Sequence, residues 1–295
     1  MCSGEGCSPL WLAAGYGHVD ALTKLIAAGG DPSAATSAGD TPMLAATSRN
    51  HTKCVELLLA CPGVEPGVAN KNGDHPMGIA AGKGRGDIVS LLLGAVARGS
   101  GGAGAAAALA NKPNGRGVSP LAAAAAFGPR PGETTLAAVD ALLAAGADPA
   151  ARDANGATPL MVAAHCANPL AVEALLRHGA SSAVDVEADG GAVDVHAADA
   201  QGATALWLAA VEGCAGSVAA LLAAGADARG GSPGGVDACD AAAKNGHAKV
   251  AALLAPANTS PAAEPAASEP SAAAEAEPAA PEPGPGDVGN AESAE

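Results

Sequence analysis

Short apolar runs alternate with turn signals up to about residue 254, and the same arrangement returns seven times. Each return is marked by a tripeptide. Five of these have a central Pro, as in Thr158-Pro159-Leu160, and two weaker copies follow. The tripeptides start at Ser8, Thr41, His75, Ser119, Thr158, Thr204 and Val236. Their central residues lie 32 to 46 positions apart. This spacing is typical of stacked helical units, since one unit alone cannot bury its apolar face.

Within each unit the pattern predicts two short antiparallel helices and an extended turn. Pro at a first helical position, such as Pro159, favours a helix start because its missing N–H would have no partner there. A second apolar run, such as residues 139–143, has helical spacing, and the Gly that follows it, Gly146, favours the end of that helix. We expect a repeat domain over 1–255, with repeats near 7–34, 37–66, 69–98, 114–149, 153–180, 199–228 and 233–254.

The residues of one unit carry a family resemblance. Thr158-Pro159-Leu160-Met161-Val162-Ala163-Ala164, followed by Leu175-Leu176-Arg177-His178-Gly179-Ala180, resembles the repeat pattern of ankyrin-repeat proteins. The resemblance covers about 7–254. It implies an all-α solenoid of helix-turn-helix units with short hairpin turns. It also implies a function in binding other proteins on the concave side, which the turn tips and the exposed ends of the first helices form.

The chain departs from the family at one position. The family usually has His directly after Thr-Pro-Leu, where the ring joins neighbouring turns by hydrogen bonds. That position holds Trp11, Leu44, Gly78, Ala122, Met161 and Trp207. We therefore expect weaker hydrogen bonding between repeats in this layer, with packing contributing more of the stability.

Composition fits small repeats that each bury little surface. The chain is 49% hydrophobic but only 1% aromatic, and alanine is abundant. No run reaches the 18 or more apolar residues of a membrane helix, and no signal peptide pattern is present. We therefore expect no membrane association and a soluble protein of the cytoplasm or nucleus.

Charge is unevenly distributed along the sequence. Residues 256–295 contain eight acidic residues, no Lys or Arg, and eight prolines, so we expect a disordered tail. The net charge of the chain is −15. An acidic chain without a basic stripe cannot release counterions from phosphates, which argues against a nucleic-acid partner.

No enzymatic activity, metal or cofactor is predicted. The seven cysteines never form a Cys-x-x-Cys pair, so the paired spacing of a zinc site is missing. His165 and Cys166 are adjacent, but neighbouring residues on a helix point about 100° apart. They do not form a nucleophile and its base.

The predicted binding surface has two groups of residues. The first is the last exposed position of each first helix, and His165 lies beside it. The aromatic and basic character of its first four members predicts a partner segment with an acidic or apolar portion. This row holds Tyr16, Arg49, Lys83, Phe127, Cys166 and Glu212. The second group lies at the turn tips, where polar residues also keep a turn solvated. It holds Asp40, Lys71, Asn72, Asp74, Arg116, Asn155 and Gln201.

Two functions from different classes remain open at this point. The first is a stand-alone adaptor or scaffold that binds one protein partner. The second is a substrate-recognition or regulatory subunit of an enzyme complex such as a ubiquitin ligase. Because no segment resembles a ligase-recruiting box or a phosphatase-docking segment, we favour the first. A third reading is an incomplete gene product, since Met1 lies almost inside the first repeat. Insertions are expected near 99–110, 128–133 and 181–195, and the first of them, rich in Gly and Ala, is predicted to be flexible.

Overall fold

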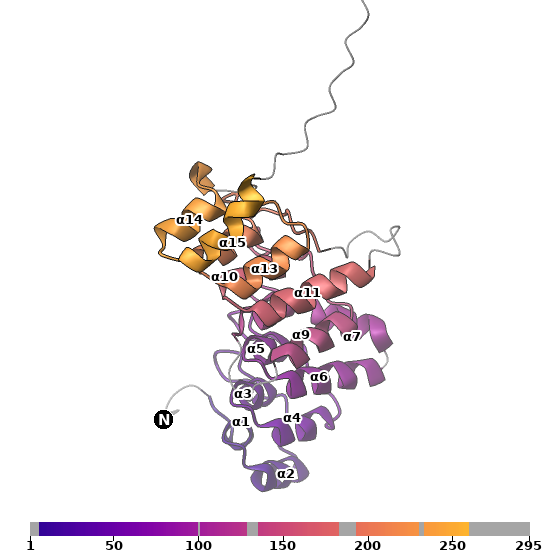
Figure 1. Cartoon of the computed structure of the whole chain (residues 1–295). Helices are drawn as coiled ribbons and strands as arrows, with labels where there is room; N and C mark the ends of the chain where they lie inside the picture. Colours follow the sequence, from indigo (N-terminus) through magenta and orange to yellow (C-terminus); the bar gives the residue numbers. More distant parts are fainter. Residues whose placement is uncertain (1–5, 100, 129–134, 183–192, 230–232, 260–295) are drawn as a thin grey trace, which may run out of the picture. The chain divides into compact units, whose positions relative to one another are not determined.

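The computed structural model describes residues 6–99, 101–128, 135–182, 193–229 and 233–259. In these ranges it contains fifteen α-helices and a 3₁₀ turn at Pro233–Gly235. Fourteen of the helices form seven successive pairs, which stack in chain order (Figure 1). This arrangement confirms the predicted all-α solenoid.

The first helix of each pair has seven residues and begins after a side-chain cap. These helices are α1 (Pro9–Gly15), α3 (Pro42–Ser48), α5 (Pro76–Gly82), α8 (Pro120–Ala126), α10 (Pro159–His165), α12 (Ala205–Val211) and α14 (Ala238–Lys244). In each, the residue before the helix accepts a hydrogen bond from the backbone N–H three residues on. In the seventh pair this cap is Asp237, so the predicted register there, with Asp237 in the place of Pro, is wrong by one residue. An Asp side chain caps a helix as Thr does.

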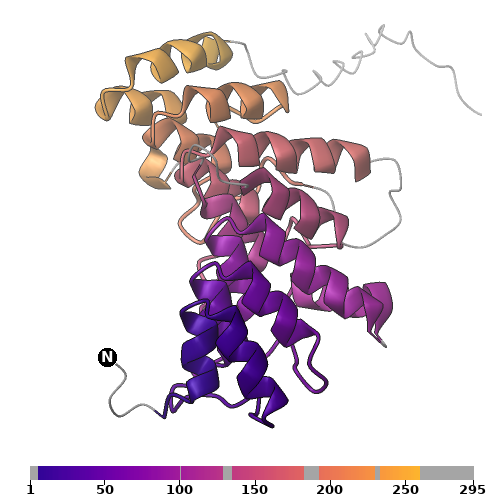
Figure 2. The same ribbon diagram turned by 90° about the horizontal axis from the view of Figure 1, so that it is seen from below.

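The second helices are longer and form a separate layer. They are α2 (Val19–Ala27), α4 (Thr52–Leu59), α6 (Gly86–Arg98), α9 (Thr135–Ala144), α11 (Pro169–Ser182), α13 (Ala215–Ala223) and α15 (Ala248–Thr259). Each first helix contacts the first helix of the next pair, and each second helix contacts the next second helix. The same succession of helix pairs is visible in the turned view (Figure 2).

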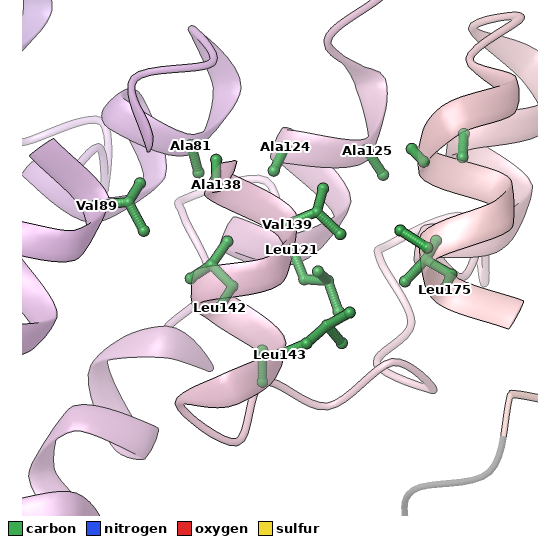
Figure 3. Close-up of a cluster of buried hydrophobic side chains, with 14 of the residues drawn as sticks. Ala81, Val89, Leu121, Ala124, Ala125, Ala138, Val139, Leu142, Leu143 and Leu175 are labelled. Carbon is green, nitrogen blue, oxygen red and sulfur yellow. The ribbon is translucent and has the colours of Figure 1, made fainter. Parts of the chain in front are cut away.

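The core lies between these two layers and continues from pair to pair. In its middle, Leu121 of α8 and Leu142 of α9 are fully buried, and they lie near Ala81, Val89 and Leu175 of neighbouring pairs (Figure 3). Much of the core surface comes from alanine, which loses no side-chain entropy when it is buried. Because the core continues across the contacts between successive pairs, each pair buries apolar surface against its neighbours.

The sequence prediction for the first insertion needs correction. The insertion near 99–110 is predicted to be flexible, but residues Gly102–Ala110 form a helix, α7, that packs on α6. Its alanine-rich sequence favours a helix, and α6 supplies the apolar surface that such a short helix needs. Helix α15 ends at Thr259, four residues beyond the predicted end of the repeat domain at 255. Residues 260–295, and with them most of the predicted tail, lie outside the described residues.

Five of the turns between pairs share one geometry, a five-residue turn closed by a hydrogen bond from its first N–H to its last carbonyl. In the turn at 70–74, the Asn70 N–H donates to the Asp74 carbonyl at 2.8 Å, and Asn70 Oδ1 accepts from the N–H groups of Asn72 and Asp74. Gly73 adopts a φ of 78°, which Gly reaches without strain. The same closing hydrogen bond joins 36 to 40, 114 to 118, 153 to 157 and 199 to 203.

One of the two tryptophans restores the hydrogen bond that the family's His would make. Trp207 Nε1 donates to the Val236 carbonyl of the next repeat at 2.9 Å. The prediction of weaker bonding in this layer is therefore wrong for Trp207. Trp11 occupies the equivalent position in the first repeat, and its buried Nε1 has no acceptor among the described residues.

This difference between the tryptophans predicts different costs for the same substitution. Trp207→Phe and Trp11→Phe remove the same atoms, but only Trp207→Phe breaks a hydrogen bond and leaves a carbonyl without its donor. We expect Trp207→Phe to lower the free energy of unfolding by about 1 kcal/mol more than Trp11→Phe. Urea unfolding followed by circular dichroism measures both values. Equal losses would show that the indole N–H of Trp207 contributes nothing.

The cap of α5 is a buried histidine. His75 Nδ1 accepts from the Gly78 N–H at 3.3 Å, and Nε2 lies 2.9 Å from the Lys112 carbonyl, to which it donates in the neutral form. Burial lowers the pKa of His75 below its ordinary value, and this effect outweighs the hydrogen bond to Lys112, which raises the pKa. The folded protein therefore prefers a neutral His75.

A lowered histidine pKa makes stability depend on pH. Below about pH 6.5, the ordinary histidine pKa, the unfolded chain binds a proton that the folded chain does not. His75 should therefore stabilise the fold fully above this pH and less as the pH falls toward its lowered pKa. His75→Thr introduces the cap that Thr41 and Thr158 provide elsewhere and does not titrate. Urea unfolding at pH 7.5 and pH 5.5 gives the free energy of unfolding of both proteins. We expect wild type to lose stability relative to His75→Thr when the pH is lowered from 7.5 to 5.5. A constant difference would contradict the assignment.

Candidate functional site

The structure places the predicted row at one equivalent position in each repeat. Every member is the residue directly after a first helix, and His165 is the last residue of α10. The members are Tyr16, Arg49, Lys83, Phe127, Cys166 and Glu212. Asn245, which follows α14, continues the row in the seventh repeat, and the sequence analysis missed it. The constant spacing could have predicted Asn245, because each member of the row lies seven residues after the first residue of its helix.

Several members of the row also join neighbouring repeats. Arg49 Nη1 donates to the Gly15 carbonyl at 2.9 Å, and Lys83 Nζ donates to the Ser48 carbonyl at 2.7 Å. Asn245 Nδ2 makes the matching bond to the carbonyl of Val211 at 3.3 Å. Each of these carbonyls belongs to the last residue of the preceding first helix, where carbonyls lack partners within the helix. The row thus caps helix ends across the repeat boundary.

A second set of residues, which the sequence did not predict, also forms hydrogen bonds to carbonyls of the preceding repeat. It lies two positions after the row, at the start of the second helices. His51 Nε2 lies 3.1 Å from the Gly15 carbonyl, and His247 Nε2 lies 3.0 Å from the Val211 carbonyl. Asn168 Nδ2 donates to the carbonyls of Ala125 and Phe127. These hydrogen bonds join neighbouring repeats beside the row.

The aromatic and basic residues of the first two repeats form one cluster. The Arg49 guanidinium lies 4.7 Å from the ring centre of Tyr16 and 5.8 Å from that of Trp11. The Tyr16 side chain is 52% exposed, and its ring stacks on His18 at 6.3 Å between centres. Cation–π contact of this kind holds the guanidinium in place while its edge remains accessible.

Phe127 differs from the expected exposed anchor. It is half-buried, and a methyl group added at Gly84 would lie only 2.6 Å from Phe127 Cε1. The ring therefore covers Gly84 of the preceding repeat and contributes to packing. Of the two predicted aromatic anchors, Tyr16 is the more exposed, and Phe127 is partly covered because its ring packs on Gly84 of the preceding repeat.

The predicted turn-tip residues all lie in the five-residue turns. The third positions of four turns are exposed, and they hold Asn72, Arg116, Asn155 and Gln201. Lys71 is also exposed, and its N–H donates to the Ala38 carbonyl of the preceding turn at 3.0 Å. Asp40 and Asp74 are half-buried, and the Asp40 carboxylate accepts from Asn70 Nδ2 at 2.9 Å. These two act mainly within the turns.

A hollow brings three predicted residues from different elements together. It has a volume of about 400 Å³ and lies between the turns at 153–157 and 199–203 and helices α10 and α12. Asn155, His165 and Gln201 line it, together with Asp153 and Asp199. Its apolar lining comes from Ala157, Met161, Val162 and Leu208. We call this hollow the groove.

The end of α10 beside the groove is an acidic environment. His165 Nδ1 lies 3.3 Å from Glu212 Oε1. Burial, and secondarily the Glu212 carboxylate, raise the pKa of the Cys166 thiol. A raised thiol pKa disfavours the reactive thiolate. The described residues contain no group of three or more His, Cys, Asp or Glu side chains placed to hold a metal ion.

Comparison with known proteins identifies the family. A family model described as ankyrin repeats, in three copies, matches residues 10–101 and 132–231. Because this match covers more than half of the sequence, the chain belongs to the ankyrin-repeat family. Ankyrin repeats are generally protein–protein interaction modules and are typically non-catalytic. A search of curated proteins found no match. Among the described helices, none is long and apolar enough to cross a membrane.

Proposed function

We propose that this protein is a non-catalytic adaptor or scaffold that binds a partner protein on the face formed by the ends of the first helices and the turns. The observation that carries the proposal is the groove. It gathers Asn155, His165 and Gln201 around an apolar floor. An apolar centre with a polar rim is the usual anatomy of a protein interface.

The polar groups of the groove favour particular side chains of a partner. Asp153, Asp199 and Glu212 give this region acceptor oxygens and negative charge. Asp153 Oδ1 and Asp199 Oδ1 accept backbone N–H groups of their own turns, which fixes these carboxylates in place. A partner segment with an apolar side chain flanked by Lys, Arg or amide donors fits this arrangement.

The chemistry of the same region supports a binding role over catalysis. A catalytic cysteine needs a lowered pKa and an adjacent base. Burial raises the pKa of Cys166, and the neighbouring His165 contacts Glu212 instead. The groove thus offers contact surface and hydrogen-bonding groups, and it offers no activated nucleophile.

The groove proposal predicts which surface a partner needs. The triple variant Asn155→Ala/His165→Ala/Gln201→Ala removes the rim and leaves the helix caps intact. We expect it to lose at least one protein that wild type recovers from its native cells, with recovery reduced by about tenfold, since each lost hydrogen bond costs about 1 kcal/mol and the variant removes three polar side chains. Quantitative mass spectrometry of tagged, full-length protein measures the recovery.

The matched control changes three exposed residues on second helices: Asp140→Ala/Glu173→Ala/Lys249→Ala. It should recover the same proteins as wild type, and circular dichroism should show equal helix content for all three proteins. If the groove variant and the control recover the same proteins in the same amounts, the groove is not the binding site. If the protein lost from the groove variant is a recurring subunit of one enzyme, the role is recognition within that enzyme complex rather than stand-alone scaffolding.

A further inference from the structure

We propose that Tyr16, Arg49 and Lys83 form a second docking surface, the N-terminal ridge, which binds a carboxylate-rich peptide segment of a partner protein. This inference deepens the proposed function and rests on it, because it assigns a partner chemistry to a different part of the same face. The sequence left open an acidic or an apolar partner portion for this region. Phe127 is half-buried against Gly84, whereas Arg49 and Lys83 are exposed and held in place, which favours the acidic portion.

The cations of the ridge are held by neutral groups. Arg49 donates to the Gly15 carbonyl and lies over the Tyr16 ring, and Lys83 donates to the carbonyl and hydroxyl oxygens of Ser48. In the described part of the chain, neither cation has a carboxylate within ion-pair distance. The helix ends that they cap supply only about half a negative charge each. Both side chains are exposed, so their remaining donors are available to an anion.

The stacking of the repeats sets the distance between the two cations. Arg49 and Lys83 follow α3 and α5, which are neighbouring first helices in contact. Packed helices lie about 8–10 Å apart. A peptide in the polyproline II conformation advances about 3.1 Å per residue with three residues per turn, so acidic side chains three positions apart lie on one face about 9 Å apart and meet the two cations in turn. The half-exposed Tyr16 ring lies in the first repeat, next to Arg49 of the second. It is placed to contact an apolar side chain at that end of the segment.

The charge of the rest of the molecule restricts where an acidic segment can bind. Residues 1–99 contain seven Lys and Arg and eight Asp and Glu, whereas residues 256–295 are acidic without a single basic residue. The groove at repeats 5 and 6 is lined by Asp153 and Asp199, and Glu212 contacts His165 beside it. Like charges in those regions disfavour an acidic segment there, whereas residues 1–99 are close to neutral and present Arg49 and Lys83 as exposed cations.

The test measures binding of a defined peptide to the full-length protein. The probe is a fluorescein-labelled peptide of about 12 residues with Glu at every third position, Leu at one end, and Gly and Ser elsewhere. The control peptide has Gln in place of every Glu. We expect saturable binding of the Glu peptide by fluorescence anisotropy, weaker binding at higher salt, and little binding of the Gln peptide. Equal affinities for the two peptides would overturn the proposal.

The protein variants locate the site. Arg49→Gln/Lys83→Gln removes both charges and keeps an amide donor for the Gly15 and Ser48 carbonyls. Lys24→Gln/Lys53→Gln makes the same charge change on exposed positions of α2 and α4. Each lost cation of the ridge should weaken binding about three- to fivefold, and the control should change it less than about twofold. Equal losses in the two double variants would mean that the peptide senses net charge only, which would overturn the ridge.

Two further variants test whether the chain's own acidic segment binds the ridge and whether the ridge and the groove act independently. Replacing the Glu residues of 260–295 by Gln should leave the affinity for the Glu peptide nearly unchanged. A marked increase would show that the chain's own acidic segment occupies the ridge and would overturn the assignment to a partner. The groove variant Asn155→Ala/His165→Ala/Gln201→Ala should bind the Glu peptide as wild type does. If it does so but loses no cellular partner, the ridge stands and the groove proposal fails.

Discussion

The close approach of neighbouring first helices is the constraint on which the rest of the structure depends. A methyl group added at Gly15 would lie 3.4 Å from the methyl of Ala45 in the next first helix, and one added at Gly82 would lie 3.5 Å from that of Ala123. Small residues at these facing positions let the helices approach, and the side chains that follow α3 and α5 reach the last carbonyl of the preceding first helix. The hydrogen bonds from Arg49 and His51 to Gly15 depend on this spacing. The surface row is thus a consequence of core packing.

Local signals in the sequence were enough to predict the architecture and the register of the row. A capping side chain before Pro and a constant offset of seven residues place Tyr16 and Arg49 at equivalent positions without any tertiary information. The failures involve long-range contacts. Helix α7 packs on the surface of α6, and the partial burial of Phe127 involves its contact with Gly84, 43 residues earlier in the chain. The groove likewise combines two turns and two helices, and the sequence shows their members only as separate candidates.

The buried side-chain polar atoms without a hydrogen-bond partner lie in the same three repeats as the ridge. In the described ranges they are Trp11 Nε1, Thr47 Oγ1 and Arg85 Nε, and all three belong to the first three repeats. Thr47 stands where Ala81 and Ala164 occupy the equivalent position in other repeats. Each buried group without a partner costs stability, typically about 1–3 kcal/mol. Departures from local consistency concentrate at functional sites in many proteins, and this grouping agrees with a binding role for the same repeats.

The hydrogen bonds between repeats also affect how the ridge can bind an acidic segment. A flexible Arg or Lys loses rotamer entropy when it contacts a partner, and this loss offsets much of the gain from an exposed ion pair. Arg49 and Lys83 are already held by carbonyls and, for Arg49, by the Tyr16 ring. A guanidinium has five N–H donors and an ammonium has three, so these hydrogen bonds leave others available. An acidic segment can therefore bind without breaking the contacts that hold the repeats together, and stability and recognition use the same side chains without competing for them.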